Sequence, residues 1–338
     1  MLAARLHKFG EPLRIEEVPR PVPHEGEILI EIEASGVCHS DLHLASGDWP
    51  AFAKLIKLPL ILGHEVVGGV VELGSAVDRE LLGKRVGVPW VYWSCGECVA
   101  CRAGRENICR SRMITSVSVD GGYAQYILAK ATHAPRVPDE LSAAEAAPLF
   151  CAGVTVYRAL KNAEVRAGQR VAIFGIGGLG HLAVQIAAAW CAEVIAVDIA
   201  EDKLSFARES GATKLLNARE CDAGAELAAA GGVDVALVAA GNKAAYDAAF
   251  AAVGVNGAVV IVGLPPEPVS FDAGRLVRNE ARVLGSAVGT REDVRATLAL
   301  AAAGKLHCRT ESRPLEKINE IFDEMRAGKI LGRVVLAP

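Results

Sequence analysis

The sequence predicts an α/β protein made of two parts, a β-rich first part and a doubly wound parallel sheet. Its 338 residues exceed what one typical hydrophobic core organises. Up to about residue 150, short alternating segments are separated by turns rich in Gly and Pro. From about residue 141 onward, short Val/Ile runs alternate with Ala-rich helical segments, which is typical of a parallel sheet covered on both faces.

In the first part, strands are expected at residues 28–33, 66–73 and 85–88. The first of these alternates apolar and charged side chains with a period of two, so one of its faces is buried. Together with the many turns, these strands predict a small barrel or sandwich with long loops.

In the second part, strands are expected at residues 171–174, 194–197, 233–238 and 258–262. Each is a nearly continuous apolar run between helices, as in a buried parallel sheet. The tail after residue 290 reads as helix and then as a strand at 332–336, which we expect to pack on the first part.

Charge and composition exclude several classes of partner. The chain has 36 basic and 40 acidic side chains, a net charge of −4, so neither nucleic acid nor an anionic membrane is expected as a partner. Neither a signal peptide nor a membrane span is indicated, and a cytoplasmic location is the expectation. Nine cysteines, with a cluster between residues 95 and 109, favour metal binding over disulfides.

A glycine-rich turn follows the strand at 171–174 and opens a helix. It consists of Gly175, Gly177, Gly178, Leu179 and Gly180. In a Gly-x-Gly-x-x-Gly turn the glycines allow the tight bend, the approach of a pyrophosphate and close helix packing. Asp198 ends the next strand 18 residues after Gly180, where a carboxylate accepts hydrogen bonds from a ribose diol and repels a 2′-phosphate. The sequence therefore predicts binding of NAD rather than NADP; the alternative is a glycine turn without a phosphate ligand.

Four cysteines have the spacing C-x2-C-x2-C-x7-C: Cys95, Cys98, Cys101 and Cys109. Four thiolates suit one tetrahedral Zn²⁺ with no open position, which stabilises a loop instead of catalysing. One alternative is an iron–sulfur cluster, whose fourth Cys follows after three residues and precedes Pro, whereas Arg110 follows Cys109. The other alternative is a set of unpaired surface thiols.

A second set of potential ligands is dispersed along the chain. Residues 36–43 read Gly-Val-Cys-His-Ser-Asp-Leu-His and contribute Cys38, while His64 and Cys151 stand further along. A Cys2His set leaves one tetrahedral position for water or substrate, and alcohol dehydrogenase is the standard example of that ligation.

In order along the chain come the motif at 36–43, Gly47-Asp-Trp-Pro, Gly63-His-Glu, the cysteine cluster, Cys151-Ala-Gly-Val-Thr, the glycine turn and Gly332-Arg-Val-Val. Over essentially the whole chain these motifs resemble the zinc-dependent medium-chain alcohol dehydrogenases, in particular the tetrameric ethanol dehydrogenases of bacteria and yeast. The resemblance implies a GroES-like β-barrel catalytic domain (1–152 and 289–338) and a Rossmann NAD-binding domain (153–288). It also implies two Zn²⁺ per chain, NAD, a small alcohol or aldehyde substrate and a homotetramer.

The resemblance also implies roles for individual residues. Cys38, His64 and Cys151 correspond to the ligands of the catalytic zinc. Two acidic residues lie around the metal in such enzymes: Asp41 corresponds to the residue that orients the ligand His, and Glu65 to one that joins the coordination shell transiently. Ser40 corresponds to the hydroxyl that takes the alcohol proton, and His43 to the base that ends the proton relay. The cofactor contacts outside the glycine turn and Asp198 are His39, Thr155, Lys203, Val262, Leu264, Ser286, Val288 and Arg333. Trp49 and Trp90 correspond to aromatic walls of the substrate pocket.

The implied reaction is reversible hydride transfer between a primary or small secondary alcohol and NAD⁺, giving an aldehyde or ketone and NADH. Zn²⁺ as a Lewis acid stabilises an alkoxide, and an imidazole with a pKa of about 6.5 suits the end of a proton relay. The alternatives are a polyol, threonine or aldehyde relative, a zinc-free quinone or enone reductase, and a non-catalytic NAD-binding protein. Cys151 disfavours the polyol enzymes, which tend to carry Glu there, and the complete ligand set disfavours the other two.

Plainer roles also exist for single residues. Glu65 could pair an Arg, His43 could be a surface residue, and Trp49 and Trp90 could belong to the core. Cys191 stands where such sequences usually have Gly with a positive φ, so we expect the helix end there to differ. Phe52 and Leu55 make the predicted pocket mouth apolar, which suits longer or aromatic alcohols.

Overall fold

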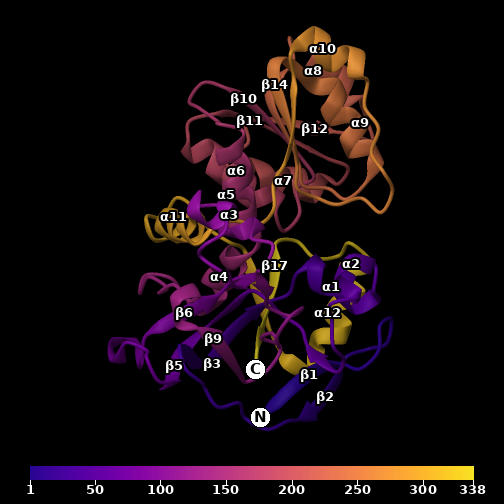
Figure 1. Cartoon of the computed structure of the whole chain (residues 1–338). Helices are drawn as coiled ribbons and strands as arrows, with labels where there is room; N and C mark the ends of the chain where they lie inside the picture. Colours follow the sequence, from indigo (N-terminus) through magenta and orange to yellow (C-terminus); the bar gives the residue numbers. More distant parts are fainter. The chain divides into compact units, whose positions relative to one another are not determined.

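The computed structural model describes residues 1–338 as two compact units (Figure 1). The first unit contains Met1–Val154, Gly289–Ala303 and Cys308–Pro338, and the second contains Thr155–Val288 and Gly304–His307. Both chain ends therefore belong to the first unit. The return of Gly304–His307 to the second unit is a feature that the sequence analysis did not anticipate.

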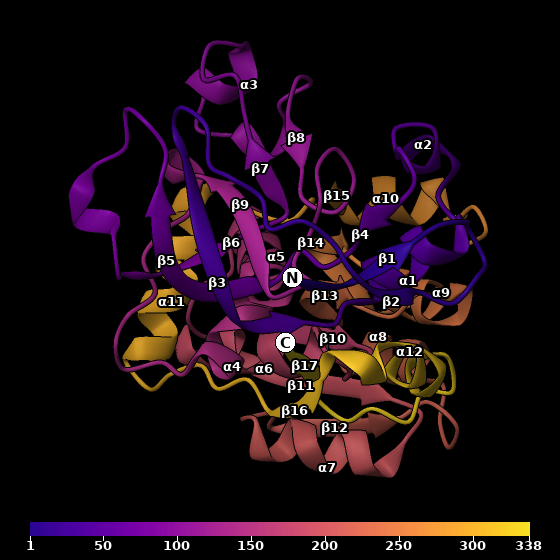
Figure 2. The same ribbon diagram turned by 90° about the horizontal axis from the view of Figure 1, so that it is seen from below.

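The first unit is built on a sheet of order β16-β17-β3-β5-β6, with β9 also paired to β3. Its strands are β3 (Glu27–Gly36), β5 (Val66–Leu73), β6 (Arg85–Val88), β9 (Tyr126–Lys130), β16 (Thr310–Pro314) and β17 (Arg333–Ala337). Figure 2 shows β3, β5 and β9 side by side. The apolar face of β3, which carries Ile28, Ile30 and Ile32, packs with Val66 and Val86 into one core, as the period of two predicted.

Smaller elements complete this unit. A second sheet has the order β2-β1-β4, and β7 pairs with β8. Their bounds are β1 (Leu2–Leu6), β2 (Arg14–Glu17), β4 (Leu60–Ile61), β7 (Val91–Trp93) and β8 (Met113–Ile114). The helices are α1 (His39–Ser46), α2 (Pro50–Ala53), α3 (Val99–Arg102), α4 (Ala143–Ala146), α11 (Arg291–Ala302) and α12 (Ile318–Arg326). The predicted strand at the chain end is β17, and it pairs with β3 of the first unit as expected.

The second unit contains one parallel sheet of order β12-β11-β10-β13-β14-β15. Its strands are β10 (Arg170–Phe174), β11 (Glu193–Asp198), β12 (Lys214–Asn217), β13 (Val233–Val238), β14 (Val253–Ile261) and β15 (Arg282–Gly285). Its helices are α6 (Gly180–Ala189), α7 (Glu201–Glu209), α8 (Ala223–Ala229), α9 (Lys243–Ala252) and α10 (Ala273–Asn279), and α5 (Ala152–Asn162) begins in the first unit.

The order of these strands determines where a ligand can bind. The chain runs outward from β10 through β11 to β12 and then returns to the other side of β10 with β13. In a doubly wound sheet, this reversal leaves a crevice at the carboxyl end of the first strand, where dinucleotides bind. That end of β10 is followed directly by the glycine turn, so the predicted α/β class with a Rossmann unit is confirmed. Across the whole chain, no helix is both long and apolar enough to cross a membrane.

The end of α6 corrects one expectation. Cys191 has a φ of 61°, so the left-handed residue that usually is Gly is retained with a cysteine. Its carbonyl accepts a hydrogen bond from the N–H of Gly168 at 3.0 Å, and its side chain is exposed. The backbone at the end of α6 is therefore the same as with Gly, and the left-handed conformation costs free energy because Cys191 has a Cβ atom.

Close packing beneath Cys151 depends on one glycine in β6. A Cβ atom at Gly87 would lie 2.0 Å from the ring of Phe150, which is fully buried and precedes Cys151 in the chain. The position of Cys151 thus depends on a ring that leaves no room for a methyl group.

We predict that Gly87→Ala lowers the free energy of unfolding by about 1–3 kcal/mol, the usual range for an overpacked core. The matched control is Gly285→Ala, where an added Cβ meets nothing within 4 Å. Thermal denaturation followed by circular dichroism should show a lower melting temperature for Gly87→Ala only. Equal melting temperatures for the two variants would contradict this packing.

Candidate active site

The structure brings two groups of potential metal ligands together, both in the first unit. One group contains Cys38, His64, Glu65 and Cys151, and the other contains Cys95, Cys98, Cys101 and Cys109. Within each group all ligand atoms lie within 4.8 Å of one another. The structure therefore brings together potential ligand atoms from distant parts of the sequence.

The three predicted ligands of the first group come from three connections between elements. Cys38 is the N-cap of α1, His64 lies between β4 and β5, and Cys151 lies between a 3-10 turn (Ala147–Phe150) and α5. The Nε2 atom of His64 is 3.3 Å from Sγ of Cys151. Hydrogen bonds from Cys151 and His64 lower the pKa of the Cys38 thiol well below its usual value, although burial opposes this. A thiolate, which is the form that binds zinc, is therefore favoured at Cys38.

Asp41 holds this ligand group in place through hydrogen bonds to its buried carboxylate. Its fully buried carboxylate accepts hydrogen bonds from the backbone N–H groups of Cys38 (3.3 Å) and Gly63 (3.0 Å) and from the hydroxyl of Tyr123 (2.9 Å). The ring of His64 makes the fourth contact through Nδ1, at 3.0 Å. A proton on Nδ1 leaves Nε2 as the atom that can bind a metal. Tyr123 was not identified from the sequence, because no motif around it marks a polar contact.

Glu65 makes an ion pair with Arg333 at 2.5 Å, and both side chains are buried. The plainer role that the sequence left open for Glu65, pairing with an Arg, is thus present, and its carboxylate also belongs to the ligand group. Burial raises the pKa of Glu65, and the positive charge of the adjacent Arg333 opposes this shift and favours the ionised carboxylate. A Cβ at Gly36 would lie 2.0 Å from Oε2 of Glu65, so a glycine there makes room for the carboxylate.

The residues predicted for proton transfer lie along α1. Ser40 is partly exposed in the first turn of the helix, and its N–H points to Sγ of Cys38 at 3.5 Å. His43 follows one turn later, where its Nδ1 lies 2.9 Å from Oδ2 of Asp48 and its ring stacks on Trp49. His39 is exposed at the start of the helix.

An aromatic wall lies beside the buried ligand group. The ring of Trp90 meets that of His64 edge-on, with 4.7 Å between centroids. Phe52 lies 5.9 Å from Trp90, and Trp49 lies 5.6 Å from Phe52. The predicted wall residues Trp49 and Trp90 are therefore joined by Phe52, which the sequence analysis placed at the pocket mouth.

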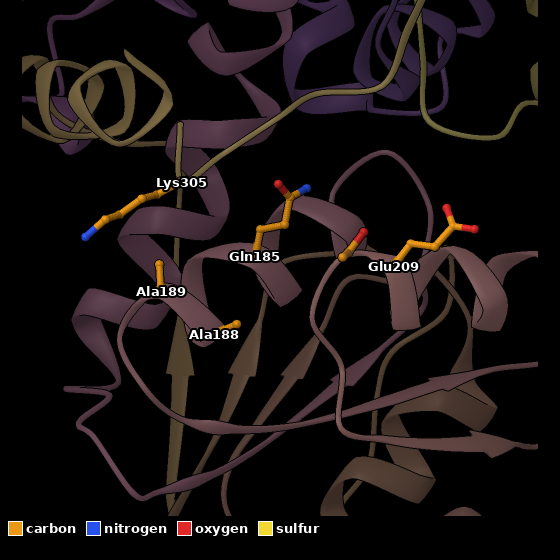
Figure 3. Close-up of a pocket in the computed structure, with 6 residues that line it drawn as sticks. Gln185, Ala188, Ala189, Glu209 and Lys305 are labelled. Atoms are coloured by element: carbon orange, nitrogen blue, oxygen red, sulfur yellow. The ribbon is translucent and has the colours of Figure 1, made fainter. Parts of the chain in front are cut away.

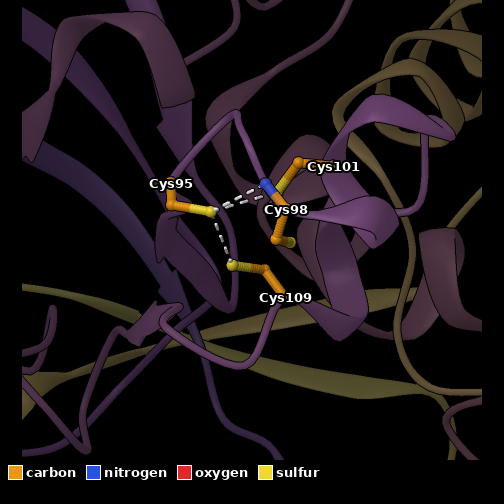
Figure 4. A group of neighbouring side chains, drawn as sticks. All are labelled: Cys95, Cys98, Cys101 and Cys109. Atoms are coloured by element: carbon orange, nitrogen blue, oxygen red, sulfur yellow. Dashed lines mark hydrogen bonds between the residues drawn. The ribbon is translucent and has the colours of Figure 1, made fainter.

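Figure 4 shows the four cysteines of the second group converging from a loop around α3. Sγ of Cys95 lies 3.5 Å from Sγ of Cys109 and 3.9 Å from Sγ of Cys101. Zn–S bonds of about 2.3 Å in a tetrahedron place sulfur atoms about 3.8 Å apart, so the four thiols fit one zinc. Backbone N–H groups of Cys98 and Glu97 lower the pKa of Cys95 to about 6, which favours the thiolate that zinc requires.

In the second unit the glycine turn has the shape of a phosphate cradle. Gly175 has a φ of 94°, and a Cβ at Gly180 would lie 2.0 Å from the carbonyl oxygen of Gly175. A Cβ at Gly177 would instead meet nothing within 4 Å, so the backbone there is open to a ligand. The carboxylate of Asp198 accepts hydrogen bonds from the N–H groups of Ile176 (2.6 Å) and Ile199 (2.7 Å). The turn and the acid are therefore bonded to each other and fit a dinucleotide.

The other predicted cofactor residues of this unit lie around the same sheet. Val262 follows β14 and Ser286 follows β15, at the carboxyl ends of neighbouring strands. Val288 has a φ of 40°, which is strained for a β-branched residue. Thr155 lies in α5 and Lys203 in α7, and Leu264 is 57% exposed. His39 and Arg333 belong to the first unit.

A separate surface hollow of about 360 Å³ lies at the other end of α6 (Figure 3). Gln185, Glu209, Ser210 and Lys305 contribute its polar side chains. The amide of Gln185 is already bonded to the backbone N–H and C=O of His307. None of the glycine-turn residues lines this hollow, so it is separate from the glycine cradle.

The sequence matches two family models that cover both units. Residues 24–139 match the alcohol dehydrogenase GroES-like domain, and residues 178–303 match the zinc-binding dehydrogenase domain. An alcohol dehydrogenase of Geobacillus stearothermophilus is 47% identical over 337 residues, which is 99% of each chain.

Solved structures agree with the sequence matches. The alcohol dehydrogenase of the archaeon Aeropyrum pernix superposes with a TM-score of 0.93 at 35% identity and full coverage of both chains. An acetophenone reductase from Geotrichum candidum, solved in complex with NAD, has a TM-score of 0.90 at 34% identity, covering 100% of this chain and 97% of that chain. Full-length identity, the two matched domains and the assembled ligand groups agree with the resemblance found in the sequence: the chain belongs to the zinc-dependent medium-chain alcohol dehydrogenases.

Proposed function

We propose that the chain interconverts a primary or small secondary alcohol with its aldehyde or ketone, using NAD⁺ and NADH. Cys38, His64 and Cys151 would hold a catalytic zinc, and Cys95, Cys98, Cys101 and Cys109 a structural zinc. The observation that carries the proposal is the buried Cys2His group, because three protein ligands leave a fourth position for the substrate.

When bound, the zinc supplies Lewis acidity to the substrate oxygen, and the nicotinamide accepts the hydride. The residues of the chain contribute orientation and proton transfer. Asp41 keeps the proton of His64 on Nδ1 and so presents Nε2 to the metal. Glu65, paired with Arg333, keeps a carboxylate within reach of the ligand atoms without a fixed bond to them.

The proton of the substrate hydroxyl would leave through Ser40 and His43. Ser40 follows Cys38 by two positions on the first turn of α1, close to the ligand group. With its Nδ1 proton donated to Asp48, His43 has Nε2 as an acceptor, and its ring is partly exposed to solvent. An imidazole in water takes up and releases a proton near neutral pH, which a serine hydroxyl alone does not.

The second unit would bind the cofactor, with residues 153–288 as the NAD-binding domain and residues 1–152 and 289–338 as the catalytic domain. Gly175, Gly177, Gly178, Leu179 and Gly180 would hold the pyrophosphate, and Asp198 the adenosine ribose. The remaining contacts proposed from the family are His39, Thr155, Lys203, Val262, Leu264, Ser286, Val288 and Arg333. The same resemblance supports a homotetramer.

The aromatic wall favours apolar substrates of modest size. Trp49, Phe52 and Trp90 form a continuous series of ring contacts that ends on His64. Ring faces and edges bind alkyl and aryl groups without offering a hydrogen bond. Assays with ethanol, 1-hexanol and benzyl alcohol would rank the chain length that the wall accepts.

Replacing Cys38 with Ser should abolish alcohol-dependent NADH formation, because a soft ligand of the proposed catalytic zinc is lost. Metal analysis should find about one zinc per chain in place of about two. NAD binding, measured by calorimetry, should be retained, since the cradle lies in the other unit. Full activity in Cys38→Ser would refute the ligand assignment; Cys191→Ser, an exposed cysteine outside both groups, is the matched control.

Replacing Asp198 with Ala should reduce discrimination against NADP. Losing a charged hydrogen-bond acceptor costs about 1.5–3 kcal/mol, so the ratio of kcat/KM for NAD⁺ to that for NADP⁺ should fall roughly tenfold or more. Asp202→Ala, an exposed acid four positions along the chain, should leave the ratio unchanged. No change in the ratio for Asp198→Ala would argue against its contact with the ribose.

Replacing Cys101 with Ser should lower thermal stability more than it alters the chemistry. A closed four-thiolate site contributes its metal-binding free energy to folding, and that contribution is weakened when one ligand is lost. The melting temperature and kcat of the folded fraction should be measured together, with Cys191→Ser as control. An unchanged melting temperature would count against a structural zinc.

A further inference from the structure

A second hollow, of about 370 Å³, lies in the first unit, outside the two metal-ligand groups. It is lined by the segment after α2 and by the loop that follows Cys109. Leu60 and Val117, both buried, contribute apolar surface, and the hydroxyls of Ser111 and Ser118 contribute polar surface. A hollow of this size accommodates a small organic molecule.

The charged side chains of this hollow are all positive. They are Lys57, Arg110 and Arg112, and no acidic residue lines it. None of these three cations makes an ion pair, although many basic side chains of this acidic chain do, such as Arg85 with Glu33. Cations that share one hollow repel one another, and a bound anion removes that repulsion.

Arg112 is the fixed member of this group. Its Nη1 atom donates to the carbonyl of Cys109 at 2.8 Å, and its own backbone N–H donates to the same carbonyl. Its Nε atom is buried and has no hydrogen-bond partner. The anchored Nη1 and the buried Nε fix the orientation of the guanidinium, so its charge is held at the wall of the hollow, where its remaining N–H groups can bind an oxyanion.

The chain also connects this hollow to the aromatic wall. Leu55, which lines the hollow, donates its N–H to the carbonyl of Phe52 at 2.8 Å. On the other side, the N–H of Thr115 donates to the carbonyl of Trp90 at 3.0 Å, and Thr115 lies between Arg112 and Val117 in the sequence. Trp90 in turn contacts His64. Backbone hydrogen bonds thus connect the lining of the cationic hollow to Trp90, which contacts His64, and to Phe52, which contacts Trp90.

We infer that this hollow binds the carboxylate or phosphate group of a small anion through Arg112, Arg110 and Lys57. Two sources share this chemistry: the distal anionic group of an alcohol or aldehyde substrate, and a free anion bound beside the active site. The first source rests on the proposed function, whereas the binding itself does not.

The test uses the full-length zinc-loaded enzyme at low ionic strength. Calorimetry measures binding of adipate and of inorganic phosphate to the parent protein and to Lys57→Gln/Arg110→Gln. Both replaced side chains are exposed and make no hydrogen bond, so folding should be retained. The matched control is Arg102→Gln/Arg105→Gln, which removes two exposed charges from the segment between Cys101 and Cys109, outside the hollow. Arg112→Lys keeps the charge and removes the fork.

The parent protein should bind at least one probe, and Lys57→Gln/Arg110→Gln should bind it roughly tenfold or more weakly, as expected for charge-assisted hydrogen bonds. The control should bind like the parent, and Arg112→Lys should also lose affinity. Absence of binding to the parent, or equal losses in pocket and control variants, would overturn the inference.

Kinetics then separate the two sources. If the anionic group belongs to the substrate, kcat/KM for 6-hydroxyhexanoate relative to 1-hexanol should fall about tenfold in Lys57→Gln/Arg110→Gln. If the ratio is unchanged while adipate or phosphate affinity falls, the site takes a free anion. Failure of the proposed function is distinguishable, because it would remove turnover of 1-hexanol from the parent protein without altering adipate binding.

Discussion

The active site of this chain depends on one buried carboxylate. Asp41 accepts four hydrogen bonds, from Cys38, Gly63, His64 and Tyr123, that reach it from three separate regions of the sequence. Burying a carboxylate with fewer hydrogen-bond partners would lower the free energy of unfolding by several kcal/mol. The four donors therefore make it possible for the charged form of Asp41 to be buried. In return, the carboxylate fixes the backbone of Cys38, the ring of His64 and the backbone of Gly63, which precedes β5. The geometry of the buried ligand group therefore depends on how well this single carboxylate is hydrogen-bonded.

The two units present different solutions to holding a charged ligand. In the first unit, side chains converge on one point and are fixed by buried pairs such as Glu65 with Arg333. In the second unit, the backbone itself makes the cradle, and Asp198 holds the turn by accepting the N–H of Ile176. Side-chain ligands suit a metal that needs soft donors at fixed distances, and backbone donors suit phosphate oxygens. The chain thus offers side-chain ligands that suit a metal in one unit and backbone N–H groups that suit phosphate oxygens in the other.

Much of this could be predicted from the sequence. The strands predicted at 66–73, 85–88 and 233–238 match β5, β6 and β13. They could be predicted because the pattern of apolar residues within each short segment already indicates a strand. The cysteine cluster at 95–109 could be predicted because its spacing is specific, whereas the dispersed group of Cys38, His64 and Cys151 was predicted from the family resemblance of its motifs. Tyr123, by contrast, could not be found, because its role arises only when the chain folds it over Asp41. The same holds for the contact of Phe150 with Gly87, which joins residues 63 positions apart.

Cys38 both caps a helix and belongs to the buried ligand group, and this dual position affects how the site can evolve. Its Sγ accepts the N–H of Ser40 at the start of α1, a place where Asp, Asn and Ser serve equally well as caps. These residues differ widely in hardness as metal ligands, from soft thiolate to hard carboxylate. A replacement by Ser can therefore preserve the start of the helix while it removes the ligand that the proposed zinc requires. Residue 38 thus meets two separate requirements, a helix cap that several polar residues can supply and a metal ligand that calls for a thiolate.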